Sequence, residues 1–224
     1  MTYKFDTHVH TAESSPCGRF KGAELAHLYK QAGYHGIAVT DHFYRGNFEN
    51  LHCITWEEKV DIFLTGYREA LREGSKIGLD VVLGIEATFD ENMNDYLVYG
   101  IDEDFLVNNK EFYSLGLEGF RHLVRDSDIL VFQAHPFRPG LTPAKPGLLD
   151  GVEVYNGNPR HNSRNELAYE YAEKNNLRKL SGSDFHQITE LAKGGIVLPQ
   201  RAANSKELVN LIKEDKIIEL IQSV

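Results

Sequence analysis

Short apolar runs alternate along the chain with segments in which apolar residues recur every three or four positions. The short runs are rich in branched and aromatic residues, a pattern typical of strands that are buried on both faces of a parallel sheet. Most are four to seven residues long, which favours strands over helices. We expect strands at residues 3–11, 36–40, 80–86, 96–100, 129–133, 151–155, 179–182 and 195–198.

The segments with helical spacing lie between these runs. They predict helices at residues 22–32, before a stop at Gly33, then at 56–76, 117–125 and 165–175, and from about residue 205. No linker rich in Pro, Gly and Ser, no fixed repeat and no low-complexity block interrupts the alternation. We therefore expect an α/β fold with one barrel domain over residues 1–224, related to the (β/α)8 design.

Residues that bind metals follow the expected strands. His8 and His10 end the first strand, and because side chains alternate along a strand, both point to one face while Val9 points to the other. In a parallel barrel the carboxyl ends of the strands meet at one rim, where active sites lie. The candidate ligands there are His8, His10, His42, Glu86, His135, Asp184 and His186, with Asp41 and Asn156 beside them.

The distribution of the histidines decides whether this pattern is meaningful, since an isolated His-x-His pair can simply lie on a solvated strand. Five of the ten histidines fall at the same expected rim. His27 and His122 lie in expected helices, and His35 precedes the second strand at the opposite end. A surface or packing role is favoured for these three, while His52, in a long loop, stays undecided.

Composition narrows the class of partner. The net charge is −9, with 33 acidic and 24 basic residues, and no basic run favours binding to duplex nucleic acid. A nucleotide substrate stays possible because bound metal ions would offset local negative charge. Cys17 and Cys53 are too few for a disulfide framework. The sequence starts without a leader and has no apolar run of membrane-spanning length, so we expect a cytoplasmic protein without membrane contact.

Five motifs that contain the candidate ligands follow one another along the chain. They are His8-x-His10, Thr40-Asp41-His42, Gly84-Ile85-Glu86, Ala134-His135-Pro136 and Gly182-Ser183-Asp184-x-His186. These motifs and their order resemble those of the PHP (polymerase and histidinol phosphatase) family. The resemblance implies a distorted seven-stranded (β/α)7 TIM-like barrel that holds two or three divalent ions of zinc, manganese or iron. Imidazole and carboxylate ligands suit all three metals.

The resemblance also implies how the ligands are shared. One ion would take His8, His10, Glu86 and Asp184, a second would share Glu86 and take His135, and a third would take His42 and His186. The chain departs from the family pattern twice. Asn94-Asp95-Tyr96 replaces a histidine ligand of the second ion, and Cys17, with Glu13 nearby, replaces a ligand of the third. Cys17 is either a zinc ligand or a small buried residue of a turn.

The activity implied by the resemblance is hydrolysis of a phosphate ester, a small phosphomonoester such as histidinol phosphate or a nucleotide, by a metal-activated bridging hydroxide. Glu86 and Asp184 would hold the metals for catalysis, and Asp41 would orient a ligand or relay protons. Arg19, Arg138 and Arg160 lie on expected rim loops, where they could clamp phosphate. His161 could protonate the leaving group, contact substrate or stabilise its loop, and Asn156 could bind substrate or a ligand.

Two other classes of function are weighed against this one. An amidohydrolase-type metal hydrolase also begins with His-x-His, but that pattern calls for a metal-bridging lysine at a middle strand end, and none of Lys59, Lys76 and Lys110 is expected there. A regulatory or structural PHP module is disfavoured because the ligand set is intact. The natural substrate and the oligomeric state stay open.

Overall fold

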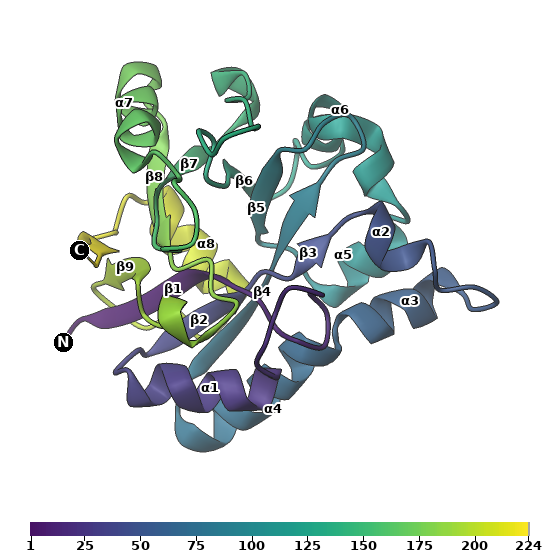
Figure 1. Cartoon of the computed structure of the whole chain (residues 1–224), viewed down its shortest axis with the longest axis horizontal. Coiled ribbons are helices and arrows are strands. Elements are labelled where there is room, and N and C mark those ends of the chain that lie inside the picture. Colours follow the sequence, from purple (N-terminus) through teal and green to yellow (C-terminus); the bar gives the residue numbers. More distant parts are fainter. Residues whose placement is uncertain (224) are drawn as a thin grey trace.

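The computed structural model describes residues 1–223, within which ten strands form one curved sheet (Figure 1). The order across the sheet is β10-β9-β1-β2-β4-β5-β6-β7-β8, and β3 pairs with β4 beside this path. The strands are β1 (Tyr3–Val9), β2 (Gly36–Val39), β3 (His42–Phe43), β4 (Asp80–Thr88), β5 (Asp95–Tyr99), β6 (Leu130–Gln133), β7 (Gly151–Asn156), β8 (Arg178–Gly182), β9 (Gly194–Leu198) and β10 (Glu219–Gln222).

The sheet is mixed. Strand β5 runs antiparallel to both β4 and β6, and β9 runs antiparallel to β1 and β10. The remaining pairs are parallel. After β8 the chain returns to β1, where Val9 pairs in parallel with Phe185 and the His10 N–H donates to the Phe185 carbonyl over 3.0 Å. The sheet therefore curves into a nearly closed, barrel-like α/β fold.

The expected barrel is confirmed as an α/β, barrel-like fold, but the expected count of seven strands and the parallel arrangement are wrong. Residues 89–94 join β4 to β5 without a helix, so β5 returns antiparallel. Residues 42–43 form the extra short strand β3, and β10 adds a strand at the C-terminal end. A continuous apolar run shows that a strand is buried but not which way it runs, which explains the error.

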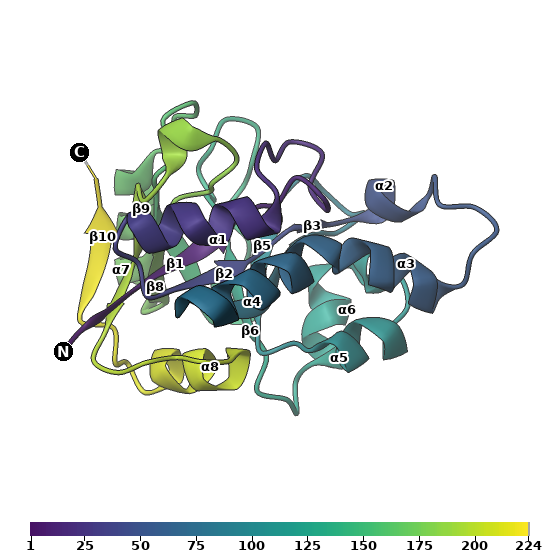
Figure 2. The same cartoon turned by 90° about the horizontal axis from the view of Figure 1, so that it is seen from below.

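Helices cover the outside of the sheet, with α1 and α4 lying side by side (Figures 1 and 2). The predicted helix 165–175 is confirmed, and the helix expected from about residue 205 begins at Ser205. The helices are α1 (Gly22–Gln31), α2 (Arg45–Phe48), α3 (Trp56–Phe63), α4 (Thr65–Ile77), α5 (Glu103–Asn108), α6 (Gly116–Leu123), α7 (Asn165–Asn175) and α8 (Ser205–Lys213), with short 3-10 turns at Phe112–Leu115, Pro146–Leu148 and Ile188–Glu190.

The predicted helix 56–76 is divided into α3 and α4 at Leu64. The cause is Ser14, whose hydroxyl donates to the Phe63 carbonyl over 2.5 Å and lies 3.4 Å from the Gly66 N–H. A side chain that enters the backbone ladder of a helix bends it. Gly66 also lets the helix approach Thr11, since an added Cβ would lie 1.9 Å from the Thr11 hydroxyl. The bend thus fixes the loop after β1 against the helices.

The barrel interior is apolar at one end and polar at the other. Phe5, Val82, Leu97 and Phe132 fill the interior, together with residues of α8 such as Leu208. Separate apolar clusters lie outside, under α1 and α4 and under α3, α5 and α6. The polar end lies at the carboxyl ends of β1, β2, β7 and β8. Within residues 1–223, no helix is both long and apolar enough to span a membrane.

Candidate metal centre

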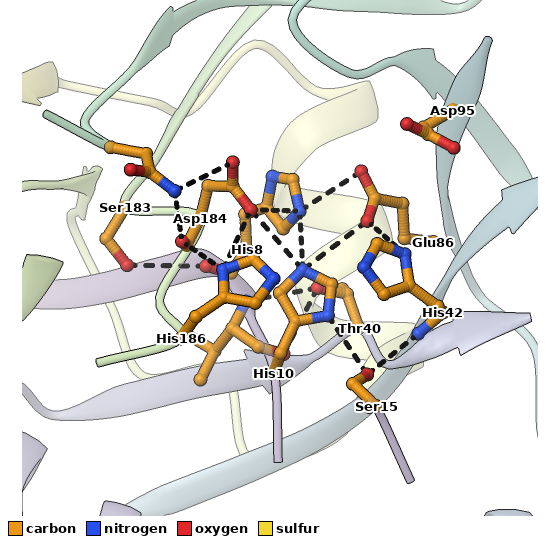
Figure 3. A network of polar contacts seen from close by, with 12 residues as sticks. His8, His10, Ser15, Thr40, His42, Glu86, Asp95, Ser183, Asp184 and His186 are labelled. Carbon is orange, nitrogen blue, oxygen red and sulfur yellow. Dashed lines mark hydrogen bonds and ion pairs between the residues drawn. The ribbon is translucent and has the colours of Figure 1, made fainter. Parts of the chain in front are cut away.

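His8 and His10 point into the polar end of the barrel from β1, as predicted (Figure 3). Their Nε2 atoms lie 3.0 Å apart, and Val9 packs on the outside with the cluster under α1. His8 Nε2 lies 3.3 Å from Glu86, His10 Nε2 lies 3.4 Å from Glu86, and both lie 3.5 Å from Asp184 Oδ1. Two imidazoles and two carboxylates therefore converge, all buried.

The partners of the other ring nitrogens assign the protons. His8 Nδ1 lies 2.8 Å from a carboxylate oxygen of Glu153, which can only accept, so Nδ1 carries hydrogen. His10 Nδ1 lies 3.2 Å from the Ser15 hydroxyl, which itself donates to Asp41 over 2.6 Å, so His10 Nδ1 donates as well. The Nε2 lone pair of His10 consequently faces His8 Nε2. One cation or proton must lie between the two rings, because facing lone pairs repel.

The pKa values of His8 and His10 show which of the two rings holds the proton between them. Burial alone would lower the pKa of His8, but the carboxylates of Glu153, Glu86 and Asp184 raise it well above its usual value. Burial and the neighbouring His186 and His42 lower the pKa of His10 well below its usual value. Without metal, the proton between the rings therefore belongs to His8.

Glu86 lies at the middle of the site, on β4. Its Oε1 is 3.1 Å from His135 Nε2, and its Oε2 is 2.8 Å from His42 Nδ1 without hydrogen-bonding geometry, so Oε2 has no hydrogen-bond partner among the described residues. Burial would raise the pKa of Glu86, but His8 and His42 hold it well below its usual value. An ionised, buried carboxylate with an unpaired oxygen fits a metal-bridging ligand.

The backbone is strained at both Asp184 and His135. Their φ angles are +52° and +29°, a region that residues other than glycine rarely adopt. Each follows the end of a strand, and each side chain points into the site. Strain of this kind persists where the surrounding structure enforces it and is typical of functional sites. Asp184 also accepts a hydrogen bond from Arg138 over 2.7 Å.

A second group of imidazoles stacks at the rim. The His10 ring lies between those of His42 and His186, at centroid distances of 4.4 and 4.3 Å (Figure 3). Cys17 is exposed and lies near both of these rings. Partial burial raises the pKa of its thiol, but the nearby His186 and His42 outweigh this and lower it to about 6. The idea of Cys17 as a buried turn residue does not hold.

Asp41 lies behind the ligands. Its carboxylate accepts hydrogen bonds from the Thr11 N–H and hydroxyl, both over 2.7 Å, and from Ser15. Ser15 in turn contacts His10 and accepts from the His42 N–H over 3.1 Å. Among the described residues, the carboxylate therefore reaches the candidate ligands through Ser15 alone, an arrangement suited to orienting them.

The sequence analysis missed two side chains of the candidate site, those of Asp95 and Glu153. Asp95, not Tyr96, lies beside the second candidate ion site: Asp95 Oδ2 is 3.9 Å from His135 Nε2, while Tyr96 packs in the apolar core. Glu153 on β7 is fully buried. Its carboxylate accepts hydrogen bonds from His8 Nδ1, from the His135 N–H over 3.0 Å and from the Asn156 side chain over 3.0 Å. The sequence did contain a signal for Glu153. An acidic residue within an apolar strand is costly to bury without a partner, so its presence there indicates one.

The candidate substrate-binding residues have different surroundings. Arg138 contacts Asp184 and Asn156, and its buried Nε has no partner among the described residues. Asn156 bridges Glu153 and Arg138. Arg160 pairs with the buried Glu190, whose other oxygen accepts from the His186 and Gln187 N–H groups. Arg19 is exposed beside His186, and its N–H donates to the His186 carbonyl.

His161 lies at the edge of the site. Its side chain is exposed, and its backbone N–H donates to the Asn158 carbonyl over 3.3 Å. Partial burial and the positive charge of Arg138 lower its pKa, and Asp184 acts in the opposite direction. The ring is therefore close enough to the candidate ligands to sense their charge. The predicted bystander His27 is remote from the site and pairs with Glu73.

The donor groups fit divalent cations. Three sets have donor atoms within 4.8 Å of one another: His8, His10 and Asp184; Glu86, Asp95 and His135; and His10, His42 and His186. A tetrahedral ion with bonds of about 2.0 Å spaces its ligand atoms about 3.3 Å apart, close to the 3.0 to 3.5 Å observed around His8 and His10. The buried carboxylates also need cations to balance their charge. Among the described residues, Arg138 is the one Lys or Arg side chain that forms an ion pair with them.

Comparisons with solved structures agree with the fold. One solved structure with the same fold is a two-domain protein from Bacteroides vulgatus that contains a predicted PHP-like metal-dependent phosphoesterase; it is 16% identical with a TM-score of 0.65, and the match covers 97% of this chain and 64% of that one. This chain thus spans less than two thirds of that protein. No curated protein sequence matches the chain.

Two further structures share the fold. PsfC from Pseudomonas syringae is 17% identical, with a TM-score of 0.66 over 93% of this chain and 88% of that one. An amidohydrolase from Chromobacterium violaceum, with bound sulfate and no metal, is 15% identical, with a TM-score of 0.54 over 96% and 97%. The PHP domain family model matches residues 6–223. With its ordered histidine and carboxylate motifs gathered at one end of the barrel, the chain belongs to the PHP domain family.

Proposed function

We propose that the chain is a metal-dependent phosphoesterase that hydrolyses a small phosphomonoester or a nucleotide. The observation that carries the proposal is the juxtaposition of two kinds of site. Buried imidazoles and carboxylates with the spacing of metal ligands surround Glu86, and the guanidinium of Arg138 lies directly beside them on Asp184. Cations and a planar donor for phosphate oxygens would thus lie together.

The protein's own residues have distinct roles in this proposal. His8, His10, His42, His135, His186, Glu86, Asp95 and Asp184 would hold the ions. Bound divalent ions would supply Lewis acidity and lower the pKa of water for attack on phosphorus. Asp41 would orient His10 and His42 through Ser15, and Glu153 would fix the tautomer of His8.

Substrate contacts would come from the rim. Arg138 has a free Nε–H to offer, His161 lies near Arg138 and is exposed, and Arg19 is exposed beside His186. Because the pKa of His161 is lowered, its ring is neutral at pH 7 and suits a hydrogen bond to substrate better than protonation of the leaving group. Arg160 and Asn156 already have protein partners, so we assign them to holding Glu190 and Arg138 in place.

The test is metal content and phosphate release measured on one sample. Elemental analysis should give two or three ions per chain, and a panel of phosphomonoesters and nucleotides with added zinc or manganese should release phosphate. Glu86→Gln should lower both metal content and turnover, whereas Glu57→Gln, an exposed change on α3, should alter neither. Metal-loaded protein that releases no phosphate from any member of the panel would refute the proposal.

An amidohydrolase-type reaction is the second candidate, favoured by the shared fold of the Chromobacterium violaceum protein. Metal sites of this kind can polarise a carbonyl as well as a phosphoryl oxygen. A parallel panel of amides and lactones separates the two reactions. Turnover of an amide without phosphate release would replace the phosphoesterase assignment.

A further inference from the structure

The segment that carries Arg138 has no helix or strand of its own. It comprises residues 136–145, between β6 and the 3-10 turn Pro146–Leu148, and we call it the strap. We propose that Asn94 and Gln133 are positioning residues that fix the strap and, through it, the guanidinium of Arg138. The proposal deepens the phosphoesterase assignment and rests on it for the role of Arg138 as a phosphate contact.

Two buried side-chain amides hold the far end of the strap. Gln133 ends β6; its Nε2 donates to the Thr142 carbonyl over 2.9 Å, and its Oε1 accepts from the Ala144 N–H over 2.8 Å. Asn94, just before β5, accepts from the Thr142 N–H over 3.1 Å and donates to the Thr142 carbonyl over 2.8 Å. Each amide thus offers the strap one donor and one acceptor, as a neighbouring strand does.

The strap is built to be held in this way. Pro143, between the two bonded residues, has no N–H that needs a partner. A third anchor comes from α7, where the Tyr171 hydroxyl donates to the Ala144 carbonyl and the Tyr171 ring packs against that of Phe137 at a centroid distance of 5.9 Å. Hydrogen bonds between buried groups add little net stability, because folding exchanges them for bonds with water. Their main effect here is to fix where the strap lies.

Two consecutive turns connect this anchored end to Arg138. The Leu141 N–H donates to the Arg138 carbonyl over 2.9 Å, and the Arg138 N–H donates to the His135 carbonyl over 3.0 Å. Pro139 and Gly140 are the central residues of the first turn. Proline fixes its own φ, and the φ of Gly140 is +95°, a combination typical of type II turns. The backbone between Thr142 and Arg138 therefore has little freedom once Thr142 is held.

The fixed backbone holds the guanidinium beside the candidate metal ligands. Arg138 donates to Asp184 over 2.7 Å, while its buried Nε has no partner among the described residues. A donor that is held in place before a ligand arrives binds an oxyanion more tightly than a mobile one. His135 is held separately, because its N–H donates to Glu153. Loss of the strap anchors should therefore weaken phosphate binding and leave metal binding almost unchanged.

The test follows Arg138 itself and the binding of inorganic phosphate to zinc-loaded protein. Asn94→Ala should speed hydrogen exchange of the Arg138 Nε–H, measured by nitrogen-15 NMR. It should also raise the phosphate Kd about fivefold, a change typical of coupled groups, while the zinc Kd stays within about twofold. Asn109→Ala is the matched control, because the Asn109 amide also donates to a backbone carbonyl, that of Phe105 on α5, and should change none of the three.

A double-mutant cycle shows whether Asn94 acts through Arg138. In protein that already carries Arg138→Ala, Asn94→Ala should change the phosphate Kd by less than about twofold. Tyr171→Phe is the second variant, in case Asn94→Ala folds poorly. It keeps the ring against Phe137 and removes only the bond to Ala144, so it should also speed exchange at Arg138 and raise the phosphate Kd.

Three results would overturn the proposal. They are unchanged exchange at the Arg138 Nε–H in the folded variants, an equal rise of the phosphate Kd with and without Arg138, and a fall in zinc affinity as large as that in phosphate affinity. Faster exchange with a phosphate Kd that Arg138→Ala does not alter would leave the positioning role intact and refute Arg138 as a phosphate contact. Phosphate binding without turnover would refute only the phosphoesterase assignment.

Discussion

Replacing Glu153 with Gln tests the hydrogen-bond network behind the metal centre. The carboxylate of Glu153 accepts three hydrogen bonds, from His8 Nδ1, the His135 N–H and the Asn156 amide, at 2.8, 3.0 and 3.0 Å. A Gln side chain has one acceptor oxygen and one donor nitrogen. Its oxygen can replace the atom shared by His135 and Asn156, and its NH₂ group then faces His8 Nδ1.

The expected result is the loss of the Nδ1 proton of His8. His8 Nδ1 must accept from the new NH₂ group, so the ring keeps only the proton on Nε2, the atom that lies 3.0 Å from His10 Nε2 and faces Glu86 and Asp184. A metal ion at Nε2 requires the ring proton to return to Nδ1. There the N–H would face the new NH₂ group, and two opposed buried donors cost about 1–3 kcal/mol. Metal affinity should therefore fall about 10–100-fold, the range typical of changes to groups that orient metal ligands.

The assay has two readouts. Competition with a chromophoric chelator at pH 7 gives the metal Kd, and nitrogen-15 NMR of the metal-free protein reports which nitrogen of His8 is protonated. Glu170→Gln, an exposed change on α7, is the control. Folded Glu153→Gln protein with metal affinity within twofold of the wild type would refute the assignment of Glu153 as the residue that orients His8.

Two further predictions concern the same end of the barrel. Asp6 is buried, and burial raises its pKa from the usual 3.8 to about 6 against hydrogen bonds from Ser183, His8 and Tyr29; its contribution to the free energy of unfolding of the metal-free protein should therefore fall by about 2 kcal/mol as pH rises from 4 to 6. Urea denaturation should show a fall about 2 kcal/mol larger over this range in the wild type than in Asp6→Asn, and an equal slope in both would contradict it. Arg138→Lys removes the planar fork and should raise the phosphate inhibition constant about tenfold, as expected for a lost charge-assisted hydrogen bond; an unchanged constant would exclude Arg138 as a phosphate contact.

Much of the site could be predicted from the sequence because the strand ends of a barrel meet in space. The candidate ligands at or near the carboxyl ends of β1, β2, β4, β6 and β8 were found from that rule without knowledge of strand order, and their side chains do come together. The rule depends on the polar residue lying directly at a strand end. The rule cannot identify residues that reach the site from the middle of a strand, as Glu153 does, or from an antiparallel strand, as Asp95 does.

Asp95 shows what strand direction adds. In the antiparallel β4–β5 pair, Thr88 is opposite Asp95 and Ala87 is opposite Tyr96. Directly opposed residues share a face, and faces alternate along a strand, so Asp95 lies on the face of Glu86 and Thr88, while Tyr96 lies on the other. Choosing between Asp95 and Tyr96 therefore required the pairing register, which an apolar run does not contain.

The same reasoning explains why this end of the barrel is polar at all. Glu86, Asp184 and Glu153 are fully or almost fully buried, and among the described residues Arg138 is the one permanent cation that pairs with them. A barrel stabilised only by packing would gain from apolar residues at these positions, since buried charges are costly unless compensated. In the metal-free state, protonated histidines such as His8 balance the charge of these carboxylates. The added proton of His8 lies on Nε2, which faces His10 Nε2. Ligands of metal ions must be deprotonated, so metal binding, proton release and stability are coupled at this one place.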